Sequence, residues 1–115
     1  MVIQAHFNEI LLEAVDYGLM VLGEKVRQAI YESLENRYEL KRREIPERLD
    51  VFHQGLERMF GPSLKIVERL IAKNLYQKLG LNFTPRPDWT LIEYVNIARN
   101  ASKSCQVQEN STGYE

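Results

Sequence analysis

Apolar residues recur at intervals of three and four positions along nearly the whole chain, and this spacing limits the fold to packed α-helices. No stretch shows the period-two alternation of a half-buried strand. The pattern therefore predicts an all-α fold, a compact bundle of about five helices. We expect a single domain over residues 1–102 and a flexible C-terminal tail over residues 103–115, where the sequence becomes polar and aperiodic.

The first two helices are separated by Gly23, a residue typical of helix ends. The first stripe consists of Phe7, Ile10, Leu11, Ala14, Val15, Gly18, Val21 and Leu22. The second helix is expected to begin at Glu24 and to end near Tyr38 to Leu40. Its inward residues are predicted to be Val26, Ala29, Ile30, Ser33 and Leu34. A charged connection follows over Lys41 to Pro46, because proline disfavours helical angles in the residue before it.

Three further helices are predicted after this connection. The third has Asp50 as its expected N-cap and a stripe of Leu49, Phe52, Leu56, Met59 and Phe60. The fourth runs from about Pro62 to Leu79 and ends at Gly80. An extended strap over Leu81 to Pro87 then leads to a last helix that Asp88 is expected to cap.

The composition is that of a globular protein that needs no metal or disulfide to form its core. The chain has 115 residues, 44% of them hydrophobic, and 15 basic against 16 acidic side chains give a net charge of -1. A domain of this size buries roughly 65% of its unfolded surface. The charge balance argues against a binder of polyanions over its whole surface. Cys105 is the single cysteine, which favours a reducing, cytoplasmic location. The N-terminus does not read as a signal peptide, and no segment is long and apolar enough to suggest a membrane partner.

Glu68 is the most informative charged residue, because it lies at the edge of the apolar stripe of the fourth helix. A carboxylate at such a position is expected to be buried and paired. Arg37, near the end of the second helix, is the predicted partner. A role for Glu68 as a general acid or base is the alternative, although the sequence places no second chemical group beside it.

No catalytic, cofactor-binding or metal-binding residues are predicted. His53 and Glu57 are one helical turn apart, as are Glu9 and Glu13, but neither pair reaches the ligand density of a metal centre. Solvated helix faces explain both pairs. The segment Gly61 to Ser63 could hold an anion at a helix start, but a helix corner is the simpler interpretation.

A local basic cluster marks the connection between the second and third helices. It consists of Arg37, Lys41, Arg42, Arg43 and Arg48. A solvated loop is the simpler interpretation, because acidic residues interrupt the cluster. The alternative is a contact with nucleic acid, which the lack of a net positive charge disfavours.

Surplus apolar residues give the better functional indication. Leu12 and Leu19 flank the main stripe of the first helix, and Ile66 and Leu70 flank that of the fourth. A peripheral helix needs only one apolar face. These leucines and Ile66 are therefore either packed on two sides within the chain or part of an interface, for which a homodimer is the expected form.

The block from Leu22 to Gly80 resembles a small archaeal all-helical family of uncharacterised function that is labelled a signal-transduction output domain. The resembling positions are Leu22 to Glu24, Ala29 to Tyr31, Leu34 to Asn36, Ile45 to Glu47, Phe60, Gly61 and Glu68. The resemblance covers about half of the chain and implies a fold and a signalling context. It brings no catalytic residues to this sequence.

The sequence thus favours a non-enzymatic interaction or regulatory module that associates with itself through the first helix and that could also bind a further protein partner. Two alternatives remain open. One is a regulator that contacts nucleic acid through Lys41 to Arg43, and the other is a helical domain that binds a small ligand near Glu68 or Tyr76.

Overall fold

Glycines with positive φ divide the chain into its helices, at the places where the sequence predicts ends. Gly23 precedes the second helix, Gly61 ends the third and Gly80 ends the fourth. The computed structural model describes the backbone of residues 2–112 and the side chains of residues 6–102. Its elements are α1 (Val2–Met20), α2 (Glu24–Tyr38), the 3₁₀-helix η1 (Arg42–Glu47), α3 (Leu49–Phe60), the 3₁₀-helix η2 (Gly61–Ser63), α4 (Leu64–Leu79) and α5 (Leu91–Thr112). The described backbone contains no strand, so the predicted all-α fold of about five helices is confirmed.

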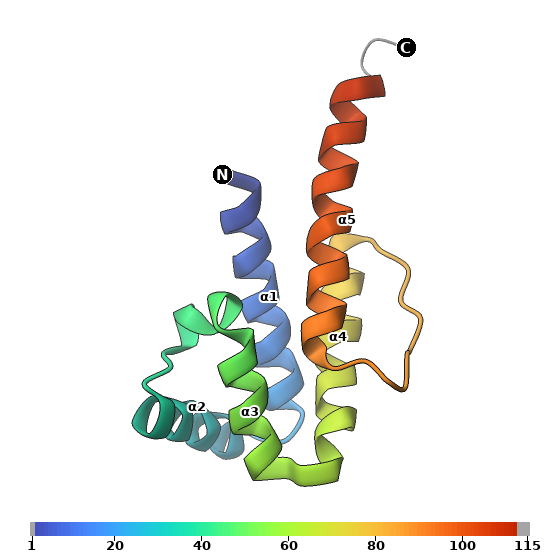
Figure 1. Cartoon of the computed structure of the whole chain (residues 1–115). Coiled ribbons are helices and arrows are strands. Elements are labelled where there is room, and N and C mark those ends of the chain that lie inside the picture. Colours follow the sequence, from blue (N-terminus) through green and yellow to red (C-terminus); the bar gives the residue numbers. More distant parts are fainter. Residues whose placement is uncertain (1, 113–115) are drawn as a thin grey trace.

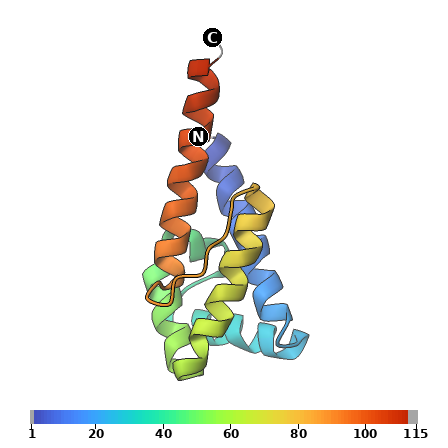
Figure 2. The same cartoon turned by 90° about the vertical axis from the view of Figure 1, so that its right-hand side faces the viewer.

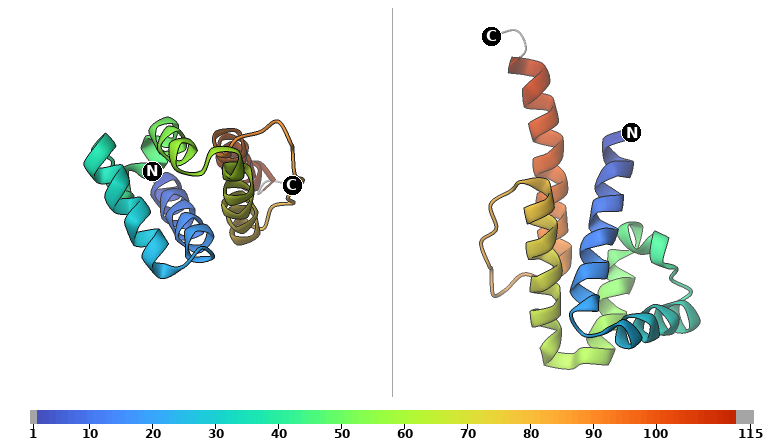
Figure 3. Two further views of the ribbon diagram at one scale, coloured as in Figure 1. Left: turned by 90° about the horizontal axis from the view of Figure 1, so that it is seen from below. Right: turned by 180° about the vertical axis from the view of Figure 1, so that it is seen from behind.

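The antiparallel pair of α1 and α4 makes the most extensive contact between helices in the molecule (Figure 1). Viewed from below, α1 lies between α2 and α4, and α3 and α5 lie on one side of these helices (Figure 3). The strap between α4 and α5 runs along the outside of α4 (Figure 2), and the C-terminal part of α5 extends past the other helices. No helix within residues 2–112 has the length and apolar character needed to cross a bilayer.

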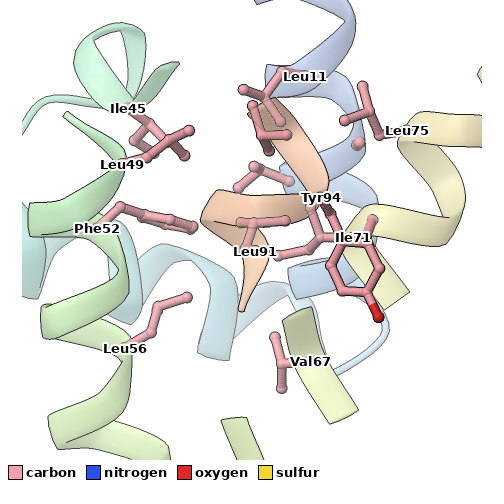
Figure 4. Close-up of a cluster of buried hydrophobic side chains, with 14 of the residues drawn as sticks. Leu11, Ile45, Leu49, Phe52, Leu56, Val67, Ile71, Leu75, Leu91 and Tyr94 are labelled. Carbon is pink, nitrogen blue, oxygen red and sulfur yellow. The ribbon is translucent and has the colours of Figure 1, made fainter. Parts of the chain in front are cut away.

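The hydrophobic core joins all five α-helices and η1. Figure 4 shows side chains of α1, α3, α4 and α5 meeting around Leu91. Leu11, Phe52, Ile71 and Leu91 are all inaccessible to solvent. Burying a leucine or phenylalanine stabilises a fold by about 1.5–3 kcal/mol, so this contact region fixes how the helices are arranged.

The strap, predicted over Leu81 to Pro87, continues to residue 90 without regular secondary structure apart from a turn at residues 87–88, and aromatic side chains hold it in place. The hydroxyl of Tyr94 accepts a hydrogen bond from the Arg86 amide at 2.7 Å and donates one to the Arg86 carbonyl at 3.2 Å. Phe83 and Trp89 pack against the Tyr94 ring, with ring centres 5.4 and 5.2 Å away. Tyr76 donates a hydrogen bond to the Tyr94 carbonyl at 2.8 Å. The strap is therefore anchored at both of its helices.

Both N-cap predictions are wrong. Arg48 precedes α3, and Asp50 lies in its first turn, where its charge complements the helix dipole instead. α5 begins at Leu91, after Asp88, because Thr90 caps it. The Thr90 hydroxyl accepts a hydrogen bond from the Ile92 amide at 3.2 Å, and the Thr90 amide donates to Glu93 Oε1 at 2.7 Å. These two bonds form a capping box.

The remaining differences concern the edges of the bundle. Val26 and Ala29 are exposed, because α2 packs through a narrow stripe around Ile30 and Leu34. Met59 is also exposed. The charged connection contains η1, which buries Ile45 and Pro46. α5 continues past the predicted start of the tail to Thr112, while residues 113–115 lie outside the described part of the chain.

Candidate functional site

Glu68 is buried, as its position on α4 predicts, with only 3% of its surface exposed. Its partner is His53 of α3, whose Nδ1 lies 2.5 Å from Glu68 Oε2. The other carboxylate oxygen accepts a hydrogen bond from the Leu91 amide of α5 at 3.1 Å. The predicted pairing with Arg37 is wrong, because Arg37 is exposed on α2. Glu68 therefore joins three helices through one carboxyl group.

Two opposing effects act on the Glu68 carboxyl. Burial raises the pKa of Glu68 above its ordinary value, because the charged form loses its hydration. The hydrogen bonds from His53 and from the Leu91 amide act in the opposite direction and stabilise the carboxylate. The two donors offset only part of the effect of burial, so the pKa of Glu68 stays above its ordinary value.

The contact with Glu68 determines which nitrogen of the His53 ring is free. A carboxylate accepts hydrogen bonds, so the proton of a neutral His53 lies on Nδ1 and Nε2 carries the lone pair. Nε2 lies 4.0 Å from Oε1 of Glu57, one turn further along α3. The His53 side chain is 19% exposed and lines a cleft on the surface.

A cleft of about 610 Å³, open on one side, lies next to this pair. Residues that line it are His53, Glu57, Lys65, Glu68, Asp88 and Trp89. The ammonium of Lys65 donates a hydrogen bond to the Pro87 carbonyl at 3.2 Å. Trp89 packs edge-on against Tyr94, and the guanidinium of Arg86 lies over the Trp89 ring. The cleft thus combines one aromatic wall with several carboxylates.

A histidine oriented by a carboxylate is suited to proton transfer or to metal coordination. Covalent catalysis would need a nucleophile beside it. The Thr90 hydroxyl also lines the cleft, but it donates to Glu93 Oε1 at 2.6 Å and accepts from Ile92. Tyr76 is not part of the cleft lining, and its hydroxyl is bonded to the Tyr94 carbonyl. Within residues 6–102, the His53–Glu68 pair and its cleft are therefore suited to binding a ligand rather than to covalent catalysis by a triad.

The basic cluster is partly occupied by contacts within the chain. Arg42 Nη2 lies 2.5 Å from Asp16 Oδ2 of α1, and Arg48 donates to the Glu39 carbonyl at 2.9 Å. Arg37, Lys41 and Arg43 are exposed. Two of the five cations thus serve to attach η1 to its neighbours, which leaves a small positive surface. Contact with nucleic acid stays a prediction.

The two interface candidates on α1, Leu12 and Leu19, do not lie on the surface. Leu19 is completely buried, and Leu12 is partly buried against the core, since this flank of α1 faces the rest of the bundle. Ile66 is 67% exposed and Leu70 is partly exposed, so a role of these two residues in an interface stays a prediction. Sequence reasoning missed Tyr17, which is 52% exposed. It placed Val21 in the apolar stripe of the first helix, and this prediction is wrong, because Val21 is 56% exposed. The spacing of four residues from Tyr17 to Val21, like the spacing of seven from Ile10 to Tyr17, is the signal that marks this second face.

Comparisons of the chain with protein-family models, with curated proteins and with solved structures gave no match. The resemblance over Leu22 to Gly80 therefore stays a prediction. Among the side chains that the structure describes, no three histidine, cysteine, aspartate or glutamate residues gather closely enough to hold a metal ion by themselves. His6, the other histidine, is exposed on α1.

Proposed function

We propose that the chain is a non-enzymatic interaction module that forms a homodimer through one face of α1 and α4. The observation that carries this proposal is a set of exposed and partly exposed apolar residues on the α1–α4 pair. Tyr17 and Val21 of α1 and Ile66 of α4 are exposed. Leu70 of α4 is partly exposed, and Ile10 of α1 is partly buried against the core. We refer to these five residues as the α1/α4 face.

The residues of the α1/α4 face share one side of each helix. A residue seven or four positions along a helix returns to the same side, which groups Ile10 with Tyr17 and Val21 on α1 and Ile66 with Leu70 on α4. The backbones approach closely where Gly18 of α1 meets Ile71 of α4. This contact sets the antiparallel register and brings Tyr17 and Val21 to the same end of the pair as Leu70 and Ile66.

The rest of the chain leaves this face uncovered. Leu12 and Leu19 of α1 lie on its opposite flank, and Glu68 and Tyr76 of α4 point toward α3 and α5. α3 and α5 accordingly lie together on one side of the α1–α4 pair (Figure 3). An apolar face on α1 and α4 is typical of a surface that is buried by association.

The charges at its two edges favour a second copy as the occupant. Glu9 is exposed along the edge of α1 and Lys73 along the edge of α4, whereas Glu13 and Lys78 already pair with each other within the chain at 3.4 Å. A two-fold axis parallel to the helices places α1 of one copy over α4 of the other, so that acidic edges meet basic edges. The other stacking arrangement, with α1 over α1, brings acidic edges together. Electrostatic complementarity therefore selects a particular symmetric dimer.

A regulatory or signalling output role in the cytoplasm completes the proposal. The resemblance over Leu22 to Gly80 supports the signalling part, and the single Cys105 supports a reducing compartment. A symmetric dimer suits such a role, because its formation can link the activity of two attached or bound partners.

The experiment is the solution mass of the purified chain, measured by light scattering behind a sizing column. We expect twice 13.5 kDa for the wild type at about 100 µM. Ile66→Glu places a charge in the apolar face and is expected to give a folded chain of 13.5 kDa. Ile97→Glu is the matched control, since Ile97 is 48% exposed on α5, and should remain dimeric. A monomeric wild type at this concentration would refute the proposal.

A further inference from the structure

A second surface, independent of the α1/α4 face, has the chemistry of a metal site. His53 and Glu57 lie one turn apart on α3 at the mouth of the cleft of about 610 Å³. From sequence, this pair is only two polar residues on a helix face. The structure adds Glu68, which comes from α4 and binds the opposite nitrogen of the same imidazole ring.

Glu68 gives His53 the form that a metal ion requires. A coordinating imidazole must be neutral with its lone pair toward the metal, and its other N–H is commonly bonded to a carboxylate. Glu68 Oε2 takes this position at 2.5 Å from Nδ1. The carboxylate is itself held by the Leu91 amide at 3.1 Å and is almost completely buried, so it fixes the orientation of the ring.

Glu57 supplies an oxygen ligand on the accessible side. Its Oε1 lies 4.0 Å from His53 Nε2, and its side chain is 65% exposed and free to change rotamer. Metal bonds of about 2.0–2.2 Å place two neighbouring ligands about 3–3.4 Å apart. A movement of the Glu57 carboxylate by less than about 1 Å therefore brings both ligands to one ion.

We propose that His53 Nε2 and the Glu57 carboxylate bind a divalent transition-metal ion of the zinc class, with Glu68 as the positioning residue. An imidazole nitrogen selects Zn²⁺, Co²⁺ or Ni²⁺ over Mg²⁺ and Ca²⁺, which prefer ligand sets made only of oxygen. Water or a ligand in the cleft completes the coordination, because the described residues provide no third side chain in a metal-binding cluster. Such a site is open and exchangeable, unlike a structural zinc site.

The test is a titration of the full-length chain with ZnCl₂, followed by calorimetry and by the NMR signals of the histidine rings. We expect one zinc ion per chain and a selective shift of the His53 Nε2 signal, while the His6 ring is unaffected. His53→Gln should abolish binding, and Glu57→Gln, which removes the second ligand, should weaken binding at least as strongly as Glu68→Gln. Glu68→Gln leaves both ligands in place and should weaken binding by about 10-fold to 100-fold.

Two control variants match these substitutions. His6→Gln removes the other histidine, and Glu13→Gln removes a carboxylate whose exposure, 62%, is similar to that of Glu57. Both should bind zinc like the wild type. Because the ring signals are recorded on the wild-type chain, the result holds even if a variant fails to fold. A shift at His6 instead of His53, unchanged binding by folded His53→Gln, or equal binding of Mg²⁺ would overturn the proposal.

Discussion

At the scale of single residues, polar side chains connect helices that the hydrophobic core alone would leave free to slide. Asp16 of α1 is the second such connection besides Glu68. Its carboxylate accepts hydrogen bonds from Tyr31 of α2 and from Arg42 of η1, and Arg27 lies 3.6 Å away. Burial alone would raise the pKa of Asp16, but the hydrogen bonds from Arg42 and Tyr31 outweigh burial and lower the pKa below 3.8.

The lowered pKa of Asp16 predicts a pH-dependent contribution to stability. A carboxyl group with a depressed folded-state pKa stabilises the fold above its unfolded pKa of 3.8, and this contribution is lost as the pH falls through the folded-state value. Asp16→Asn should lower the free energy of unfolding by about 1–3 kcal/mol at pH 7, because it leaves Arg42 without its charge partner.

Urea denaturation of the wild type and of Asp16→Asn at several pH values measures this effect. The difference between them should shrink once the pH is below 3.8. Glu13→Gln is the comparison, since Glu13 makes an exposed ion pair with Lys78 at 3.4 Å and should change stability by less than about 1 kcal/mol. A difference for Asp16→Asn that is independent of pH would contradict the assigned role of the charge.

At the scale of helices, the close approach of α1 and α4 depends on the absence of a side chain at Gly18. A Cβ atom there would lie 2.5 Å from Cγ1 of Ile71, which is fully buried and has no room to move away. Alanine improves helix propensity by about 1 kcal/mol. Overpacking costs about 1–3 kcal/mol, so Gly18→Ala should lower the free energy of unfolding despite its better propensity.

Chemical denaturation of Gly18→Ala checks this prediction. Ala29→Gly measures the propensity effect alone, because Ala29 is exposed in α2, and should cost about 1 kcal/mol. A stabilised Gly18→Ala variant would show that the two helices can separate slightly at no cost. The α1/α4 face would then be less rigid than the proposed dimer requires.

Helix ends and helix faces could be predicted from the sequence, because both depend on local rules. Gly80 ends α4 as expected, since its positive φ of 72° suits glycine. The start of α5 was misplaced, although Thr90 and Glu93 show the capping-box spacing, because Asp88 is an equally good cap by residue type. The turn that closes between Arg86 and Trp89 delays the helix, and sequence patterns do not reveal it.

Contacts between helices could not be predicted from the sequence. The periodicity indicated that Glu68 would be buried. Whether Arg37 of α2 or His53 of α3 pairs with Glu68 depends on how α2, α3 and α4 are oriented. In the same way, spacing identified two apolar flanks on α1 but not which of them the bundle covers. Leu19 is on the covered flank and Tyr17 on the open one. Only the positions of α2 and α3 distinguish the two.

At the scale of the whole molecule, the uneven arrangement of helices around α1 and α4 predicts that stability depends on protein concentration. If dimerisation buries the α1/α4 face, unfolding is coupled to dissociation. A tenfold rise in concentration then stabilises each chain by about 0.7 kcal/mol, which raises the thermal midpoint of a domain of this size by about 3 °C.

Calorimetric scans at several protein concentrations test this dependence, and the charged edges add a second signature. Salt screens exposed charges, so added NaCl should weaken the dimer and reduce the concentration dependence of the midpoint. Ile66→Glu should show a midpoint that is independent of concentration, while Ile97→Glu should behave like the wild type. A wild-type midpoint that does not change with concentration would mean that the α1/α4 face stays open in solution, and the apolar residues Tyr17, Val21 and Ile66 would then have to be explained by a different partner.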